Sequence, residues 1–339
     1  METRALRKVY PAPKAKRTPR GAPSFAPGTP AMAPGGGMTS ASGDIIALDA
    51  LDLAIPAGEF FGLLGPNGAG KTTTIGILTT RVLPTSGQAL VHGSDVVQQA
   101  VLVRQRIGVV PQRPNPDRGL TVIENLLFHA AYFGFSRSAS VKRAQQILDQ
   151  LALGDRGDAK VDHLSGGQQQ RLMIARALIH EPDVIFLDEP TVGLDPQARL
   201  ALWEILRRLH AEGRTIVMTT HYMEEADQLC DRIAIVDRGK LLACDAPEEL
   251  KKQAPGGTLI EIVLDGDATP AVEPARAIPG MLKVDADGRT LRATNSRGGE
   301  AVAALIASAQ NAGRQVRDIH LAPPSLETLF VSMTGRKLD

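Results

Sequence analysis

Apolar and polar positions alternate along the chain in blocks that predict strands and helices in turn. Short, almost wholly apolar runs at 60–64, 107–110, 184–187, 215–218 and 233–236 are typical of strands buried on both faces of a sheet. The stretches 72–83, 122–132, 141–151, 168–178, 196–212 and 222–229 carry apolar residues at helical spacing. Strands that alternate with helices in this way predict an α/β fold around a mainly parallel sheet.

The pattern changes near residue 253. Strand-like runs follow at 259–264, 281–284, 290–293 and 316–321, with helical stretches at 300–312 and 325–334 and a hairpin turn at 285–288. We therefore expect a first domain over residues 1–253 and a small α/β domain over 254–339.

Two strand-like segments near the start of the chain, at 4–10 and 45–55, are separated by an unusual stretch. Residues 11–43 hold seven prolines and the run Gly35-Gly36-Gly37. Residues 1–43 contain seven Lys and Arg and one acid, a balance of +6 in a chain whose net charge is +1. Because such a segment cannot offset its ordering entropy by burial, we expect a disordered insertion at about 11–43. We expect a plain flexible loop, and contact with anionic lipid is the alternative.

The overall composition excludes several classes of protein. With 43% hydrophobic and 22% charged residues, it is that of a soluble globular protein. No apolar run approaches the ~18–20 residues of a membrane-spanning helix, and the basic start lacks the apolar stretch of a secretory signal. Two cysteines cannot supply a disulfide framework or a zinc cluster. The net charge of +1 argues against a dedicated nucleic-acid binder.

A glycine-rich loop follows the apolar run at 60–64 and opens a helical stretch. Residues 65–72 read Gly-Pro-Asn-Gly-Ala-Gly-Lys-Thr and fit the phosphate-binding pattern G-x-x-x-x-G-K-[ST] at every fixed position. Backbone N–H groups of such a loop surround phosphate oxygens, Lys71 reaches the β- and γ-phosphates, and the Thr72 hydroxyl binds Mg²⁺. The alternative is a glycine-rich strand-to-helix turn that binds nothing.

Two further motifs carry compatible chemistry. Asp188 and Glu189 end the apolar run at 184–187, which places Asp188 to hold Mg²⁺ and makes Glu189 the candidate general base. The sequence Leu-Ser-Gly-Gly-Gln at 164–168 precedes a helix and offers an anion one hydroxyl, two unobstructed amides and a helix dipole. A plain helix N-cap by Ser165 is the alternative there.

Together these motifs resemble those of the ATP-binding subunit of an ABC transporter. Residues 65–72 match the family's Walker A loop, Gln112 its Q-loop, 164–168 its signature, 184–189 its Walker B strand, 193–195 its D-loop and His221 its switch histidine. Their order and spacing agree across about residues 44–253. The resemblance implies a P-loop NTPase cassette with a mainly parallel sheet core, an antiparallel β subdomain and a helical subdomain.

The resemblance also implies ATP and Mg²⁺ as cofactors and assigns the site residues. Glu189 would orient the attacking water, His221 would hold the γ-phosphate, Lys71 would bind phosphate, and Gln112 would sense Mg²⁺ and the membrane partner. Thr72, Gln112 and Asp188 would hold the metal. The nucleotide-binding set comprises Gly65, Pro66, Asn67, Gly68, Ala69, Gly70, Lys71, Thr72, Thr73, Tyr10, Ser165, Gly166, Gly167, Gln168 and Asp195.

In this family two subunits close head to tail around two ATP molecules, so that Ser165, Gly166 and Gly167 of one would face the Walker A loop of the other. The family also places an aromatic residue before Walker A to stack on adenine. The matching position lies near Ser42, which has no ring. We expect Tyr10 to supply the ring. A translation start at Met38 and a Tyr10 in a disordered tail are the alternatives.

The C-terminal run Pro-Ser-Leu-Glu-Thr-Leu-Phe at 324–330 resembles the ending of daunorubicin-resistance and nodulation-factor exporter ATPases. This implies ATP hydrolysis that powers export through a separate polytopic membrane subunit, at the cytoplasmic face of the inner membrane, with residues 113–134 as the docking surface. We expect no nucleic-acid partner. The alternative is a soluble ABC ATPase acting on ribosomes or nucleic acid, although such members usually carry two cassettes, a long coiled coil or zinc cysteines. An importer ATPase is disfavoured by the C-terminal ending.

Overall fold

The computed structural model describes residues 1–11, 38–39, 43–254, 257–322 and 324–334. The chain divides into two compact units, Met1–Ala246 and Pro247–Leu338. The expected domain boundary, after residue 253, lies a few residues beyond this division. None of the described helices is long and apolar enough to cross a membrane.

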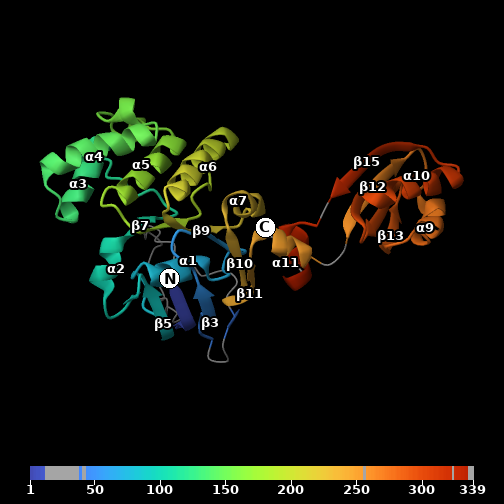
Figure 1. Cartoon of the computed structure of the whole chain (residues 1–339), viewed down its shortest axis with the longest axis horizontal. Coiled ribbons are helices and arrows are strands. Elements are labelled where there is room, and N and C mark those ends of the chain that lie inside the picture. The colour runs from blue at the N-terminus through green and yellow to red at the C-terminus, as the bar shows by residue number, and fades with distance from the viewer. Residues whose placement is uncertain (12–37, 40–42, 255–256, 323, 335–339) are drawn as a thin grey trace, which may run out of the picture. The chain divides into compact units, whose positions relative to one another are not determined.

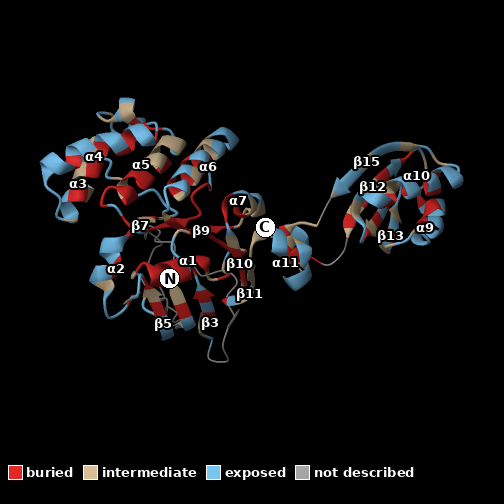
Figure 2. Cartoon of the chain, in the orientation of Figure 1, coloured by how far each residue is buried: buried red, intermediate tan, exposed pale blue. Residues whose placement is uncertain are grey.

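The first unit is built around a six-stranded sheet in the order β11-β10-β4-β9-β8-β7 (Figure 1). Its parallel strands are β4 (Phe60–Leu64), β7 (Ile107–Val110), β8 (Val184–Asp188), β9 (Thr215–Thr220) and β10 (Arg232–Asp237), and β11 (Lys240–Asp245) pairs antiparallel at one edge. Every residue of β4, β8 and β9 is buried, and β9 is accordingly red in Figure 2. The prediction of an α/β fold around a mainly parallel sheet is confirmed.

An antiparallel sheet in the order β2-β3-β1-β5-β6 packs against this core. It consists of β1 (Glu2–Tyr10), β2 (Met38–Thr39), β3 (Ile45–Ala54), β5 (Ser86–Val91) and β6 (Ser94–Asp95). The strands expected at 4–10 and 45–55 are therefore present, and they pair so that Tyr10 lies opposite Ile45. Of the insertion expected at about 11–43, Met38–Thr39 form β2 against β3, and residues 12–37 and 40–42 lie outside the described part of the chain.

Seven α-helices are described in this unit, namely α1 (Lys71–Leu78), α2 (Ala100–Arg106), α3 (Val122–Tyr132), α4 (Arg137–Gln150), α5 (Gly166–Leu178), α6 (Pro196–Ala211) and α7 (Met223–Leu229), with short 3₁₀ turns at Gly154–Arg156 and Val161–His163. Helices α3, α4 and α5 pack on one another and form the helical subdomain (Figure 1). α1 ends earlier than the expected 72–83, because Thr80 adopts a left-handed backbone conformation with φ +63°.

The second unit contains α8 (Pro247–Lys252), β12 (Thr258–Leu264), α9 (Thr269–Arg276), β13 (Met281–Asp287), β14 (Thr290–Asn295), a 3₁₀ turn (Gly298–Ala301), α10 (Val302–Asn311), β15 (Val316–Ala322) and α11 (Leu326–Thr334). Its antiparallel sheet runs β13-β14-β12-β15, so that β12 to β15 with α9 and α10 form a β-α-β-β-α-β unit. The hairpin turn lies two residues later than expected. Asp287 pairs with Thr290, and Gly288 between them has φ +56°.

Candidate functional site

Three neighbouring parallel strands, β4, β9 and β8, deliver the predicted site residues to one edge of the sheet. The Walker A loop follows β4, Glu189 follows β8, and His221 follows β9. Because the carboxyl ends of parallel strands meet at the same edge, segments more than 100 residues apart in sequence come together here. This edge is the usual place for a ligand in such a sheet.

The fixed glycines of the Walker A loop stand where a side chain has no room. A Cβ atom on Gly65 would lie 2.2 Å from the carbonyl oxygen of Val236, and one on Gly70 would lie 2.6 Å from that of Ala47. Gly70 also has φ +107°, a conformation that L-residues rarely adopt. The predicted loop residues take different exposures: Ala69 and Lys71 are buried, Pro66, Gly68 and Thr73 are partly exposed, and Asn67 and Thr72 are exposed.

Lys71 opens α1 and is held by three oxygen atoms. Its Nζ donates to the carbonyl oxygens of Gly65 at 2.7 Å and Pro66 at 3.2 Å, and lies 3.2 Å from Glu189 Oε1. Only 4% of the Lys71 side chain and 5% of the Glu189 side chain are exposed. Burial lowers the pKa of Lys71, and the negative charge of Glu189 acts in the opposite direction.

Asp188 is surrounded by hydroxyl groups. Its Oδ1 accepts hydrogen bonds from Thr219 Oγ1 at 2.6 Å and from Thr72 Oγ1 at 3.3 Å. Burial raises the pKa of Asp188, and these hydroxyls partly offset the rise. A carboxylate beside an exposed hydroxyl is a set of hard oxygen donors that suits Mg²⁺. The described residues contain no group of three His, Cys, Asp or Glu side chains placed for a metal, and Mg²⁺ usually takes one or two carboxylates with phosphate oxygens and water.

Glu189 is the point at which the predicted catalytic residues meet. Gln112 Nε2 donates to its Oε2 at 2.8 Å, and His221 Nδ1 lies 3.5 Å from its Oε1 without forming a hydrogen bond. The backbone of Glu189 is left-handed, with φ +49°, and its N–H donates to the carbonyl and the hydroxyl of Thr219. Such strain is held only when the surroundings impose it, and it is common at functional sites.

Thr219 is the residue that sequence reasoning missed. Its hydroxyl donates to Asp188 and accepts from the Glu189 N–H, so it holds both neighbouring acids. In the sequence it only ends an apolar strand two residues before His221. A signal for this role was nevertheless available in the sequence. Thr219 is a hydroxyl residue near the end of one buried strand, and a second buried strand ends in two acids.

The signature residues form a separate group on α5. Ser165 caps this helix and exchanges two hydrogen bonds with Gln168, so the N-cap reading is correct as a description of its local contacts. Asp195 caps α6 by accepting from the Ala198 N–H at 2.8 Å. Ser165, Gly166 and Asp195 are exposed, and Gly167 is partly so. Among the described residues, no hydrogen bond or ion pair joins this group or Asp195 to Lys71 or Glu189 within one chain.

Tyr10 lies at the end of β1, not in a tail. It pairs with Ile45, and the Lys8 ammonium lies 4.9 Å from its ring centroid. Two residues after Ile45 comes Ala47, whose carbonyl oxygen is in close contact with Gly70 of the Walker A loop. The first strand therefore runs beside the strand that touches the phosphate loop.

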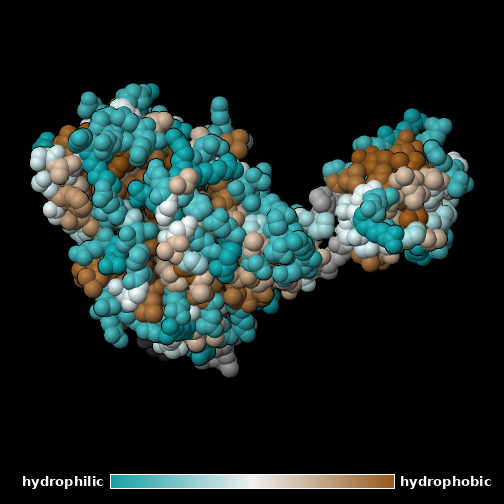
Figure 3. Space-filling view, viewed as in Figure 1, coloured by the Kyte–Doolittle hydropathy of each residue, from teal (hydrophilic) through white to brown (hydrophobic). Residues whose placement is uncertain are grey.

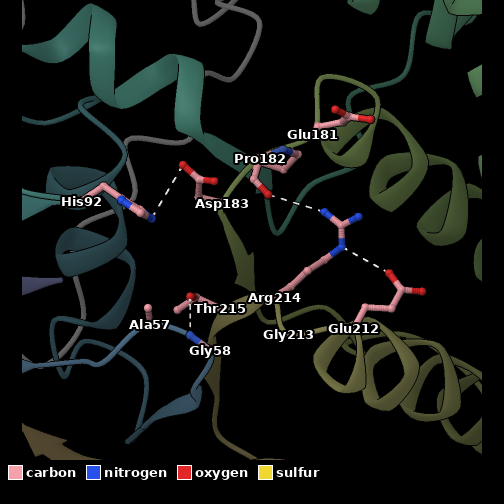
Figure 4. A pocket seen from close by; sticks show the side chains of 10 residues that line it. All are labelled: Ala57, Gly58, His92, Glu181, Pro182, Asp183, Glu212, Gly213, Arg214 and Thr215. Carbon is pink, nitrogen blue, oxygen red and sulfur yellow. Dashed lines mark hydrogen bonds and ion pairs between the residues drawn. The ribbon is translucent and has the colours of Figure 1, made fainter.

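A polar cavity of about 470 Å³ lies at the opposite ends of the parallel strands (Figure 4). Most of its lining residues lie just before β4, β8 and β9, and the others are Thr215, which begins β9, and His92, which follows β5. Its polar groups lie against their neighbours: His92 Nε2 is 3.6 Å from Asp183 Oδ2, and Arg214 pairs with Glu212 at 3.4 Å. The carboxyl-end site, with its phosphate loop, is the better candidate.

Comparison with known proteins agrees with this geometry. A model of the family described as "ABC transporter" matches residues 48–192. The Nod factor export ATP-binding protein I of Cupriavidus metallidurans is 41% identical over 298 residues, which cover 87% of this chain and 95% of that protein. The daunorubicin/doxorubicin resistance ATP-binding protein DrrA of Streptomyces peucetius is 40% identical, with 86% and 89% covered.

Solved structures give the same result for the fold. The dimeric structure of MJ0796, a bacterial ABC transporter cassette, superimposes with a TM-score of 0.59 at 27% identity, and the match covers 72% of this chain and 97% of that one. A second structure of the same cassette, bound to ADP and Pi, gives a TM-score of 0.58. This chain therefore belongs to the ABC transporter family, as one of its ATP-binding, ATP-hydrolysing cassettes.

Proposed function

We propose that this ATPase powers the export of a substrate across the cell membrane through a separate, polytopic membrane subunit. The observation that carries the ATPase part of the proposal is the convergence of Lys71, Gln112 and His221 on the buried Glu189. Relatives named for Nod factor export and for drug resistance, at about 40% identity over most of both chains, support the direction of transport.

Within the site, Lys71 and the loop amides bind the β- and γ-phosphates of ATP. Glu189 accepts a proton from the attacking water, and His221 donates to the γ-phosphate. Thr72, Asp188 and Gln112 would hold Mg²⁺, which would neutralise charge on the phosphates. Tyr10 stacks on adenine, because its strand leads toward the phosphate loop.

The site is completed by a second copy of the chain. Ser165 offers an exposed hydroxyl whose hydrogen can still be donated, and Gly166 and Gly167 offer helix N-terminal amides that form no hydrogen bond within the described part of their own chain. These groups bind the γ-phosphate in the partner's site. Gln168 and Asp195 hold the two helix starts in place. The dimeric form of the related cassette supports this arrangement.

The surface proposed to dock the membrane subunit is a groove of about 830 Å³ lined by α2, the segment after Gln112, and α3. Apolar side chains gather over α2 and α3 in Figure 3. Among the residues that line the groove, Tyr132 is 79% and Val101 62% exposed. Burial lowers the pKa of His129, in the groove wall, to about 4, so its ring is neutral near pH 7. With Arg113 at its rim, the groove suits an apolar segment that carries an acidic residue. Docking there places the chain at the cytoplasmic face of the membrane.

The proposal is tested by affinity purification of the tagged full chain from detergent-solubilised membranes, with ATP hydrolysis measured on the recovered material. We expect a polytopic membrane protein to co-purify, and a Lys71→Ala chain to recover the same protein without hydrolysis. Recovery of ribosomes or DNA in place of a membrane protein would favour the soluble ATPase instead.

A further inference from the structure

A buried carboxyl group lies next to the switch histidine and has no part in the proposed chemistry. Glu225, on α7, is fully buried, with 0% of its surface exposed. Its Oε1 accepts a hydrogen bond from Trp203 Nε1 at 3.2 Å, whereas its Oε2 is buried without a hydrogen bond of normal geometry. A buried carboxylate is costly unless polar neighbours stabilise it, so a packing role alone does not explain an acid at this position.

The neighbours of this carboxyl come from separate parts of the site. The hydroxyls of Thr220 and Thr191 and the charge of Arg199 all lower the pKa of Glu225, although burial raises it more. Thr220 immediately precedes His221 in the sequence. Thr191 begins the segment that leads to Asp195, and its hydroxyl is buried without a hydrogen-bond partner in the described part of the chain.

Side-chain contacts also connect α6 to the ring of His221, through Arg199 and Tyr222. The Arg199 guanidinium on α6 lies 4.8 Å from the ring centroid of Tyr222, and the Tyr222 and His221 ring centroids are 4.2 Å apart. The Tyr222 N–H donates to Thr220 Oγ1 at 2.9 Å. Helices α6 and α7 pack side by side (Figure 1), and Arg199 and Trp203, four residues apart, share one face of α6.

We propose that Glu225 is a positioning residue that acts through His221: its carboxyl holds α7 to α6 through Trp203, beside the loop that carries Thr220 and His221, and so fixes the orientation of the His221 ring toward Glu189. The inference rests on the proposed role of His221 at the γ-phosphate. The inference adds a second residue to that role: His221 contacts the phosphate, and Glu225 holds His221 in the orientation that allows the contact.

The first test is Glu225→Gln, which keeps the shape of the side chain and an acceptor for Trp203 but removes the charge that faces Arg199. We expect kcat for ATP hydrolysis to fall about 10- to 100-fold, because a small misplacement of a catalytic group has effects of this size. KM for ATP is expected to stay within about twofold, since Lys71 and the loop amides are untouched. Glu224→Gln, on the exposed side of the same helix, is the matched control and should keep wild-type kcat.

The decisive measurement is the double variant. If Glu225 acts through His221, then Glu225→Gln adds no further loss of kcat in a His221→Ala background. Losses that multiply, or a wild-type kcat for Glu225→Gln, overturn the inference and leave the role of His221 intact. Wild-type turnover by His221→Ala alone overturns the role of His221 and this inference with it.

A second variant covers the case in which Glu225→Gln does not fold. Trp203→Phe removes the hydrogen-bond donor and keeps a ring of similar placement, so it weakens the same link with less change in burial. Trp203→Phe should lower kcat by a smaller factor than Glu225→Gln does. In a His221→Ala background it should cause no further loss of kcat. A loss of kcat that multiplies with that of His221→Ala counts against the inference.

Discussion

The Nζ of Lys71 lies 3.2 Å from Oε1 of Glu189, and both side chains are almost wholly buried. Neither charge is solvated, so each depends on the other and on a few fixed groups: two loop carbonyls for Lys71 and the Gln112 amide for Glu189. A phosphate group that enters the loop offers Lys71 a second anionic partner. The phosphate-binding lysine and the proposed base are thus adjacent in the folded chain.

Replacement of Glu189 by Gln is expected to slow ATP hydrolysis by about 10²–10⁴-fold, the usual effect of losing a general base. ATP binding should persist, because Gln keeps the shape of the side chain and leaves Lys71 its two carbonyl partners. Phosphate release and nucleotide affinity of the purified chain measure the two effects separately. Turnover close to wild type would exclude Glu189 as the base.

Two inactive variants are expected to restore hydrolysis when mixed. Lys71→Ala disables the phosphate loop, and Gly166→Asp adds a carboxylate to the proposed phosphate-binding turn. The Asp side chain fits the fold, since a Cβ on Gly166 meets no atom within 4 Å. A mixed head-to-tail dimer contains one site in which both halves are intact. Hydrolysis should therefore appear only in the mixture, and a mixture as inactive as its components contradicts the shared site.

Removal of the Tyr10 ring is expected to weaken ATP binding. Stacking of a base on an aromatic ring contributes ~1–3 kcal/mol, which corresponds to a loss of about 5- to 150-fold in affinity for Tyr10→Ala. Tyr10→Phe keeps the ring and is the matched control. A chain that starts at Met38 lacks the whole of β1 and should bind at least as weakly as Tyr10→Ala. Equal affinities in all four chains rule out Tyr10 as the adenine contact.

The pH dependence of stability should report on Glu225. Burial raises its pKa above the ordinary value of 4.5, so the folded chain binds this proton more tightly than the unfolded chain does. The contribution of the group to the free energy of unfolding is therefore complete below pH 4.5 and falls as the pH rises through the raised pKa. Glu225→Gln lacks this fall. Urea unfolding across pH 4.5–8 should show the variant gaining stability relative to wild type as the pH rises.

For this measurement, Glu224→Gln controls for the loss of a carboxyl from the same helix. Wild-type and Glu225→Gln curves that run parallel across the whole range would mean that the Glu225 carboxyl does not titrate differently in the folded and unfolded chains.

A charge at Tyr132 is expected to disrupt docking without affecting the ATPase of the isolated chain. Because this side chain is 79% exposed, Tyr132→Asp should change basal hydrolysis less than about twofold. If the ring is a central contact, recovery of the membrane subunit should fall by about 30-fold or more. Leu282→Asp, 59% exposed on the second unit, is the control. Undiminished recovery with Tyr132→Asp contradicts the proposed docking groove.

The strands of the central sheet were predictable from sequence because their pattern comes from burial on both faces, whereas the helices were predicted from apolar residues at helical spacing. β4, β8 and β9 are continuous apolar runs because helices or a second sheet cover each side. β5 escaped notice because its first three residues are polar and exposed. α9 was not predicted because it contains Pro270 and Pro274, which disfavour a helix. Pro270 is tolerated because it lies in the first turn, where its missing N–H would have no partner within the helix.

The residues of the site likewise fall into those that could be predicted from sequence and those that could not. Lys71, Asp188 and Glu189 carry a signal in their own neighbourhood, a loop or a strand end, and could be named from sequence. The contacts of Thr219 with both acids, and the burial of Glu225 beside Thr191, depend on which strands and helices become neighbours. That information lies in long-range packing, and a local pattern does not contain it.

The hydrogen bond between Trp203 and Glu225 gives the chain an optical property. Trp203 is its only tryptophan, so all tryptophan fluorescence originates at the junction between α6 and α7. Emission from an indole ring depends on the charges and hydrogen bonds around it. The wild-type chain therefore carries an intrinsic fluorescent reporter, Trp203, at the contact between α6 and α7 next to the switch histidine. A rearrangement of this contact can be followed in real time by tryptophan fluorescence.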